Sequence, residues 1–206
     1  MRFRAIVFDF DGTLVGSAAA KRQAFFDIFP DSSAHRAVIS QVLREDPDGS
    51  RHRVIPRMVG DMHGRGLPHA EDGTAAHYIE AYAQAALTAV RACPEIPGAG
   101  RLLRSLWTAG IGIYVCSNTP HDALTALIRD RGWSAQVTAC FGHPHDKSES
   151  IAAILAGDGL QPFELAVVGD GISDQEAAAA NNCPFFHIAA ADDLLRHAVA
   201  WEVCVA

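Results

Sequence analysis

Apolar and polar positions divide the chain into two kinds of sequence. From residue 94 onward, short apolar runs alternate with stretches of helical periodicity. The strands expected there are 111–116, 137–141, 165–168 and 184–188, and the helices 101–109, 120–131, 148–156, 174–180 and 192–199. Alternation of this kind is typical of a parallel sheet covered by helices.

The start of the chain belongs with this alternating part. Residues 3–8 form an apolar strand pattern, whereas the sequence that follows predicts helices alone, at 18–29, 34–44, 52–65 and 75–91. The helical block therefore interrupts the α/β pattern. We predict an α/β core made of residues 1–15 and 94–206, with an inserted all-helical domain at 16–93.

Composition narrows the class of protein. Of 206 residues, 49% are apolar and 20% are charged, which is typical of a globular protein that forms a core. The net charge of -7, with no run of Lys or Arg, argues against a nucleic-acid partner. The five cysteines show no metal spacing, so we expect small buried residues in a reducing, cytoplasmic compartment. No signal-peptide or membrane-spanning pattern is present, so we expect neither secretion nor a membrane partner.

The first strand ends in an unusual pair of acids. In the segment IVFDFDGTLVG, Asp9 and Asp11 are two residues apart, so a strand would send both carboxylates to the same side. Two like charges at a buried position are costly unless one carries a proton or a cation lies between them. The pair therefore predicts a metal site or proton chemistry.

Other polar residues follow the remaining strands. Ser117 and Asn118 end the second core strand, Lys147 lies on a loop after the third, and Asp170 ends the fourth, with Asp174 four residues later. Because ligands collect outside the carboxyl ends of parallel strands, we expect these side chains to converge at one edge of the sheet.

Several of these residues also have simpler explanations. Thr119 is a good N-cap for a helix that begins at Pro120, and Lys147 alone would usually be a solvated surface charge. Ser173 and Glu176 have the spacing of a capping box, so the helix dipole alone explains Asp174. His143 and His145 could be read as a zinc site, but two histidines without further ligands are usually loop residues.

Taken in order, DFDGT, Ser117, Lys147 and GDGISD resemble the four motifs of the haloacid dehalogenase superfamily. The similarity is to its phosphatase-like members, which carry a helical cap after the first motif. The resemblance implies a Rossmann-like three-layer core, a Mg²⁺ ion and an aspartyl-phosphate intermediate. Asp11 favours cleavage of phosphate esters, because an alkoxide leaving group needs a proton whereas a halide does not.

The resemblance also implies a role for each residue. Asp9 is the expected nucleophile, and Asp11 the general acid and base. Asp170 completes the metal site with the Asp9 carboxylate and the backbone carbonyl of Asp11, and Asp174 is expected to lie behind these ligands. The remaining expected contacts are to the transferring phosphoryl group, from Ser117, the backbone amide of Asn118, and Lys147.

Two alternatives remain open at this point. A phosphomutase would use the same core and return the phosphoryl group to a sugar. A non-catalytic phosphoacceptor or binding protein, like a receiver domain, also combines acids, a hydroxyl and a lysine at strand ends, but it has no place for the helical block.

The helical block is interpreted as a mobile cap that selects a small phosphorylated substrate. Its candidate contacts are Arg57 above all, with Arg22 and His63, although each is also explained as a solvated helix residue. We expect the protein to be a monomer or a homodimer.

Overall fold

The computed structural model describes residues 3–47, 49–68 and 74–201. Their contacts group the chain into two compact units, Met1–Gly16 with Pro94–Ala206, and Ser17–Cys93. We call the first the core unit and the second the helical unit, and describe each by itself. No helix among the described residues is both long and apolar enough to cross a membrane.

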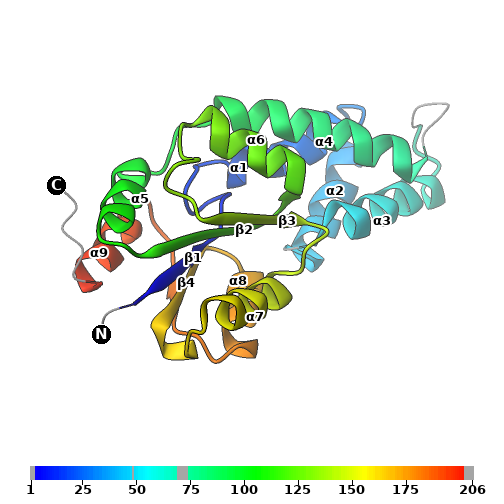
Figure 1. The fold of residues 1–206 in the computed structure, drawn as a ribbon. Coiled ribbons are helices and arrows are strands. Elements are labelled where there is room, and N and C mark those ends of the chain that lie inside the picture. Colours follow the sequence, from blue (N-terminus) through cyan, green and yellow to red (C-terminus); the bar gives the residue numbers. More distant parts are fainter. Residues whose placement is uncertain (1–2, 48, 69–73, 202–206) are drawn as a thin grey trace. The chain divides into compact units, whose positions relative to one another are not determined.

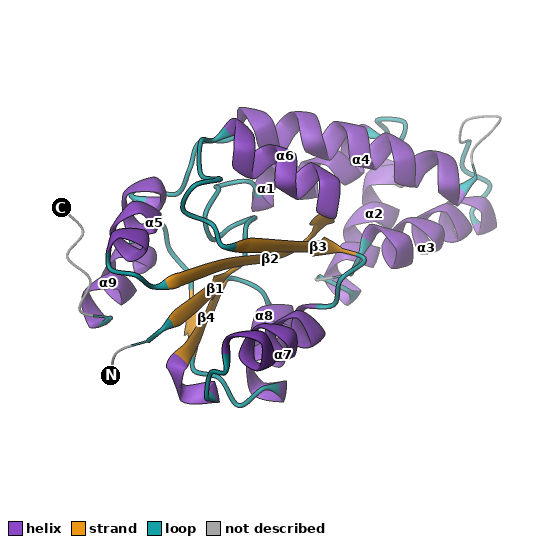
Figure 2. Cartoon of the chain, in the orientation of Figure 1, coloured by secondary structure: helices purple, strands orange, loops and turns teal. Residues whose placement is uncertain are grey.

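The core unit is a three-layer α/β structure. Its five parallel strands lie in the order β3-β2-β1-β4-β5. Figure 2 shows this sheet in orange, with α5 and α6 on one face and α7 and α8 on the other. The elements of the core unit are β1 (Ala5–Phe8), α5 (Ala99–Thr108), β2 (Gly112–Pro120), α6 (His121–Asp130), β3 (Ala139–His143), α7 (Lys147–Asp158), η1 (Pro162–Glu164), β4 (Leu165–Gly169), α8 (Ile172–Ala180), β5 (Phe185–His187) and α9 (Asp193–Ala200).

The central strand β1 explains why the sheet is buried on both faces. All four of its residues are apolar and almost fully buried, as expected for a strand in the middle of a parallel sheet. Ala5 and Val7 pack with Ile151 of α7 and Ala177 of α8. Phe8 points away from them and packs edge-on against Trp201. Alternating side chains of this apolar strand therefore pack into the hydrophobic layers on the two faces of the sheet.

The topology places a switch point at β1. The chain adds β2 and β3 on one side of β1 and then returns to place β4 on the other side (Figure 1). The core helix that follows β1, α5, and the helix that follows β4, α8, lie on opposite faces of the sheet (Figure 2). Ligands of open α/β folds bind in the crevice outside such strand ends. The predicted α/β fold is confirmed, and it brings Asp9 and Asp170 to this crevice.

Strand β2 is longer than its sequence predicts. It was expected to end at residue 116, but it continues to Pro120, with an irregular register between Ser117 and Pro120 opposite β3. The prediction that Thr119 caps α6 is wrong: the N-cap of α6 is Pro120, and its side chain makes no capping bond. The physical reason is that the Thr119 hydroxyl has a tertiary partner in the site, described below.

The helical unit has a hydrophobic core of its own. Its elements are α1 (Ala18–Asp27), α2 (Ser33–Glu45), α3 (Arg51–Gly64) and α4 (Ala75–Ala92). Two aromatic stacks join α4 to the segment around α1, Phe25 on Tyr82 and Phe29 on Tyr78, with ring centroids 4.1 and 4.2 Å apart. The side chains of Ser32 and Thr74 accept from backbone amides at the starts of α2 and α4.

Four of the five cysteines are within the described residues, and all four are free thiols. They are Cys93, Cys116, Cys140 and Cys183. Cys204 lies outside the described residues.

Candidate active site

Asp9 is held in the sheet at the end of β1. Its backbone N–H donates to the carbonyl of Val168 on β4 at 2.8 Å, and the residue is only 6% exposed. The chain then turns sharply at Gly12, whose φ of +93° is a backbone conformation that favours glycine. A bond from the Gly12 N–H to the carbonyl of Val15 closes this loop at 2.7 Å. The strand therefore fixes Asp9, and the glycine lets the chain leave the crevice.

Lys147 is a buried partner of two carboxylates. Its Nζ donates to Asp9 Oδ1 at 2.8 Å and to Asp174 Oδ1 at 2.6 Å. The expectation of a loop position is wrong, since Lys147 is the first residue of α7, where Asp146 caps the helix by accepting from the amides of Ser148 and Glu149. The cap fixes the start of α7 and so aims the lysine into the site. The solvated-surface interpretation of Lys147 is excluded, because its side chain is 9% exposed.

Three carboxyl groups gather around this lysine. Asp9, Asp170 and Asp174 each offer an oxygen, and these oxygens lie within 4.8 Å of one another. Glycines make the close approach possible. A Cβ at Gly12 would lie 2.1 Å from Asp170 Oδ2, and one at Gly169 would lie 2.3 Å from Asp174 Cγ. The glycines of DFDGT and GDGISD thus leave space for carboxylates of the cluster.

Asp174 lies in this cluster of carboxylates. Its expected position behind the metal ligands stays a prediction. The predicted capping box of Ser173 and Glu176 is not the arrangement found. Asp174 Oδ2 instead accepts from the N–H of Gly171, the N-cap residue of α8, at 3.2 Å. One carboxylate therefore caps the helix with one oxygen and binds Lys147 with the other.

Burial raises the pKa values of the three acids in the cluster. Desolvation raises the pKa of Asp9 to about 7, and the nearby Asp174 and Asp11 add to the rise, although Lys147 acts in the opposite direction. Burial likewise raises the pKa of Asp170 to about 6, and it raises the pKa of Asp174. The positive charge of Lys147 therefore does not offset the cost of burying these three acids in their ionised form. A hard divalent cation with oxygen ligands, such as Mg²⁺, fits this donor set.

A second group of contacts surrounds Asp11. Its Oδ2 accepts from the hydroxyl of Thr119 at 2.8 Å and from that of Ser117 at 3.3 Å. Thr119 was treated only as a helix cap from its sequence. The sequence did contain a signal for this contact. Ser117 and Thr119 are two residues apart, so a strand that continues past Ser117 places both side chains on the same side. Thr13 is another contact that sequence reasoning missed, since its hydroxyl donates to Asp170 Oδ1 at 3.3 Å.

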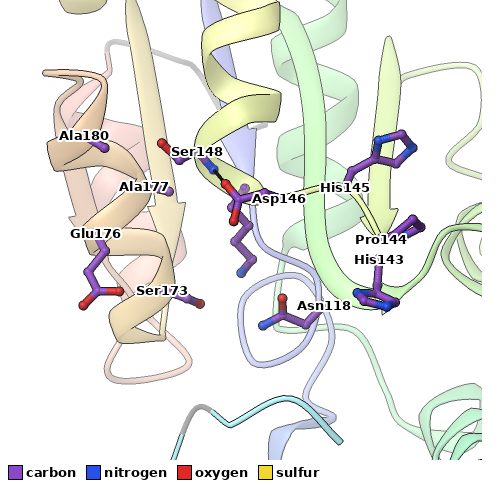
Figure 3. A pocket seen from close by; sticks show the side chains of 11 residues that line it. Asn118, His143, Pro144, His145, Asp146, Ser148, Ser173, Glu176, Ala177 and Ala180 are labelled. Atoms are coloured by element: carbon purple, nitrogen blue, oxygen red, sulfur yellow. Dashed lines mark hydrogen bonds between the residues drawn. The ribbon is translucent and has the colours of Figure 1, made fainter. Parts of the chain in front are cut away.

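A pocket of about 380 Å³ adjoins Lys147 within the core unit. Figure 3 shows it between α8 and the segment that joins β3 to α7, with Asn118 below and Ser173 pointing inward. It is lined by Asn118, His143, Pro144, His145, Asp146, Lys147, Ser148, Ser173, Glu176, Ala177 and Ala180. Lys147 is the only Lys or Arg among these described residues, and its ammonium is already bound to two acids.

Arg57 lies in the helical unit, on α3. Its guanidinium donates to Glu45 of α2. Hydrogen bonds from Gln41 and, second, from Arg57 lower the pKa of the Glu45 carboxyl. Its contact with a substrate stays a prediction.

An α/β fold with buried carboxylates and a lysine at a topological switch point places the protein in the Rossmann-like class of folds, with a crevice for a ligand at the strand ends. Residues 3–182 match the family model described as haloacid dehalogenase-like hydrolase. The chain therefore belongs to the haloacid dehalogenase-like hydrolases, as its motifs predicted.

The chain is also similar to two curated proteins. It is 26% identical over 200 residues to "Phosphoglycolate phosphatase" of Rhodospirillum rubrum, a match covering 88% of this chain and 77% of the relative. It is 27% identical over 184 residues to "Phosphoglycolate phosphatase 1" of Pseudomonas aeruginosa, covering 86% of this chain and 66% of that protein, just under two thirds.

Solved structures share the fold. One, described as a predicted phosphoglycolate phosphatase from Haemophilus somnus, has a TM-score of 0.71 at 20% identity, covering 91% of this chain and 85% of that one. Another, described as a HAD-hydrolase from Bacillus subtilis bound to magnesium, has a TM-score of 0.67 at 15% identity, covering 90% and 86%.

Proposed function

We propose that this hydrolase is a magnesium-dependent phosphatase that cleaves a small phosphorylated metabolite through an aspartyl-phosphate intermediate. The observation that carries the proposal is the buried contact between Asp9 and Lys147 beside Asp170 and Asp174. It combines a carboxylate nucleophile, a cation for phosphoryl oxygens and a donor set for a metal in one crevice. The names of the curated relatives support a phosphoric monoester as the substrate.

Each residue of the proposed site has a distinct role in this mechanism. A carboxylate oxygen of Asp9 attacks phosphorus, and the ester oxygen leaves with a proton from Asp11. Asp11 then takes a proton from water, whose oxygen attacks the aspartyl-phosphate and releases inorganic phosphate and the Asp9 carboxylate. Ser117, the backbone amide of Asn118, and Lys147 bind the phosphoryl oxygens and stabilise the charge that develops on them.

Asp9, Asp170 and the backbone carbonyl of Asp11 would hold Mg²⁺, and Asp174 lies in the same cluster. When bound, the ion neutralises negative charge on the phosphoryl group and on the nucleophile. The Bacillus subtilis neighbour, which shares the fold, is bound to magnesium according to its description, and this supports the choice of metal.

The helical unit is the proposed cap, which closes over the strand ends and selects the leaving group. Arg57 is the proposed cap contact. The pocket beside Lys147 leaves space in the core for part of the leaving group, and Asn118 and Ser173 in its lining offer hydrogen bonds to it. We therefore expect small metabolites as substrates, with phosphoproteins and nucleic acids excluded.

Phosphate release from a panel of phosphorylated metabolites, with Mg²⁺ and with a chelator, tests the proposal. Asp9→Asn is expected to abolish turnover. Asp11→Asn is expected to retain Mg²⁺ binding but to lower kcat by roughly 10²- to 10⁴-fold for alkyl phosphates, the loss typical of a missing general acid or base. The matched control is Asp122→Asn, at an exposed acid in the first turn of α6, which is expected to leave turnover unchanged.

Three outcomes would contradict the proposal. Activity of Asp9→Asn would remove the nucleophile, and activity without any divalent cation would remove the metal. Transfer of the phosphoryl group to a second hydroxyl of a sugar phosphate, without free phosphate, would identify a phosphomutase on the same core.

A further inference from the structure

Thr119 is a buried hydroxyl with a tertiary partner that no helix-capping role explains. The residue is 7% exposed, and its Oγ1 donates to Asp11 Oδ2 at 2.8 Å across a sequence separation of 108 residues. A threonine directly before a proline and a helix usually bonds to the first helical amides. Here the hydroxyl is directed to a carboxylate of the active site.

The backbone around Thr119 is built to hold it there. Strand β2 continues past Ser117, and its alternation leaves Asn118 exposed while Ser117 and Thr119 are buried on the same side. The N–H of Thr119 donates to Ser117 Oγ at 3.1 Å. Strand β3 packs tightly behind it, because a Cβ at Gly142 would lie 2.6 Å from the carbonyl oxygen of Thr119. The irregular register of this pair re-aims side chains, as bulges near active sites do.

Ser117 and Thr119 both donate to Asp11, but they cannot keep doing so together. Each hydroxyl can donate one hydrogen bond. Ser117 is expected to donate its hydrogen bond to a phosphoryl oxygen when substrate binds. Its contact with Asp11 is also the longer one, 3.3 Å against 2.8 Å. Thr119 then remains as the side-chain hydroxyl that orients Asp11 during the reaction.

We propose that Thr119 is a positioning residue that fixes the carboxyl group of Asp11 for proton transfer to and from the substrate. This inference rests on the proposed phosphatase function. The Thr119 hydroxyl donates to Oδ2, so the proton that Asp11 delivers to the leaving oxygen is carried on Oδ1. In the second step the same oxygen accepts a proton from the attacking water. Thr119 itself exchanges no proton with the substrate.

The test compares Thr119→Val, Thr119→Ser and wild type on an alkyl phosphate and on an aryl phosphate, in saturating Mg²⁺. Valine keeps the shape and loses the hydroxyl, whereas serine restores it. Thr119→Val is expected to lower kcat for the alkyl ester by about 10- to 100-fold, as for the loss of a hydrogen bond to a charged group, with KM little changed. The aryl ester, which leaves without protonation, is expected to lose less than about 3-fold.

The matched control is Thr125→Val on α6, whose exposed hydroxyl donates to the carbonyl of His121 at 2.9 Å. It is expected to match wild type on both esters. Thr119→Ser is expected to recover kcat to within about 3-fold of wild type, because it again offers a donor.

A double-mutant cycle separates positioning from general damage to the structure. In the Asp11→Asn background, Thr119→Val is expected to cost almost nothing further in kcat, because the residues act as a unit. If Thr119→Val does not fold, Thr119→Cys, with its weak donor, takes its place in every comparison.

Several results would overturn the inference. Equal losses on alkyl and aryl esters, full additivity with Asp11→Asn, or failure of serine to rescue would each show that Thr119 has a structural role. By contrast, a wild-type protein that releases no phosphate from either ester would overturn the proposed function, and the inference with it.

Discussion

Replacing Lys147 by methionine removes the only cation described in contact with the carboxylate cluster while keeping most of the side-chain volume. In the folded protein, Asp9 and Asp174 would lose bonds of 2.8 and 2.6 Å to an ammonium that is almost completely buried. The variant therefore leaves two buried carboxylates beside Asp170 without their ammonium partner.

The expected cost follows from the burial of these groups. Breaking a buried ion pair by removing one partner typically destabilises a protein by about 3–5 kcal/mol, because the remaining charge is uncompensated. For a chain of this length, about 1 kcal/mol shifts Tm by roughly 2–4 °C. In metal-free buffer at pH 7.5, Lys147→Met is therefore expected to melt roughly 10 °C below wild type. Mg²⁺ is expected to restore part of this loss, because a bound cation neutralises the same carboxylates.

The pH dependence has a definite sign. In the unfolded chain Asp9 has its ordinary pKa of 3.8, whereas burial raises it to about 7 in the folded protein. Lys147 opposes this rise, so its removal raises the folded pKa further. Between these pKa values the folded state binds protons that the unfolded state does not, and lowering the pH therefore stabilises it. The gap in Tm between wild type and Lys147→Met is expected to narrow from pH 7.5 to pH 5.

Thermal unfolding followed by circular dichroism, with a chelator present, measures both effects. Arg129→Met is the matched control, because it removes an exposed charge that lies 3.9 Å from Asp130 in the same unit. It is expected to shift Tm by less than about 2 °C. A Lys147→Met variant that melts with wild type at pH 7.5, or a gap that widens as the pH falls, would refute the electrostatic account of the cluster.

Two further predictions concern a glycine of the site and a contact away from it. Gly12→Ala is expected to weaken Mg²⁺ binding at least about 10-fold, because the new Cβ would overlap the Asp170 carboxylate and the Gly12 backbone has a φ of +93° that disfavours alanine. A Mg²⁺ titration of activity checks this, and an unchanged titration would contradict it. Tyr114→Phe removes the hydroxyl that donates to Asp158 at 2.5 Å, so urea unfolding is expected to show a loss of about 1 kcal/mol with kcat unchanged. A loss of activity as large as the loss of stability would instead connect Tyr114 to the site.

Much of the fold follows from patterns within short segments. The apolar run of β1 and the alternation of strands and helices after residue 94 are local signals, and they suffice to predict a parallel sheet. Lys147 depends in addition on the start of α7, which the Asp146 cap fixes. The ends of parallel strands bring Asp9 and Asp170 together without further information. This part of the site was predictable because the topology alone determines it.

The remaining contacts depend on tertiary partners that local patterns do not contain. Thr119 has the sequence of a helix cap, but β2 continues through it and its hydroxyl donates to the Asp11 carboxylate, which lies in the loop after β1. Asp174 suits both a helix start and a metal cluster. Its place is decided by the space that Gly169 leaves and by Lys147, which is 27 residues away in sequence. Local sequence identifies such residues as polar, but it does not choose their partners.

The division of the site between two groups of contacts also explains why the first motif needs two acids. Asp9 lies with Lys147 and the carboxylate cluster, where burial raises its pKa and a cation would restore its charge. Asp11 is bound by hydroxyls of β2, which can orient a carboxyl group in either protonation state. A nucleophile must stay ionised, whereas a general acid and base must gain and lose a proton in each cycle. In the proposed mechanism, Asp9 and Asp11, which both follow β1, thus meet opposite requirements, because β1 lies between β2 and β4.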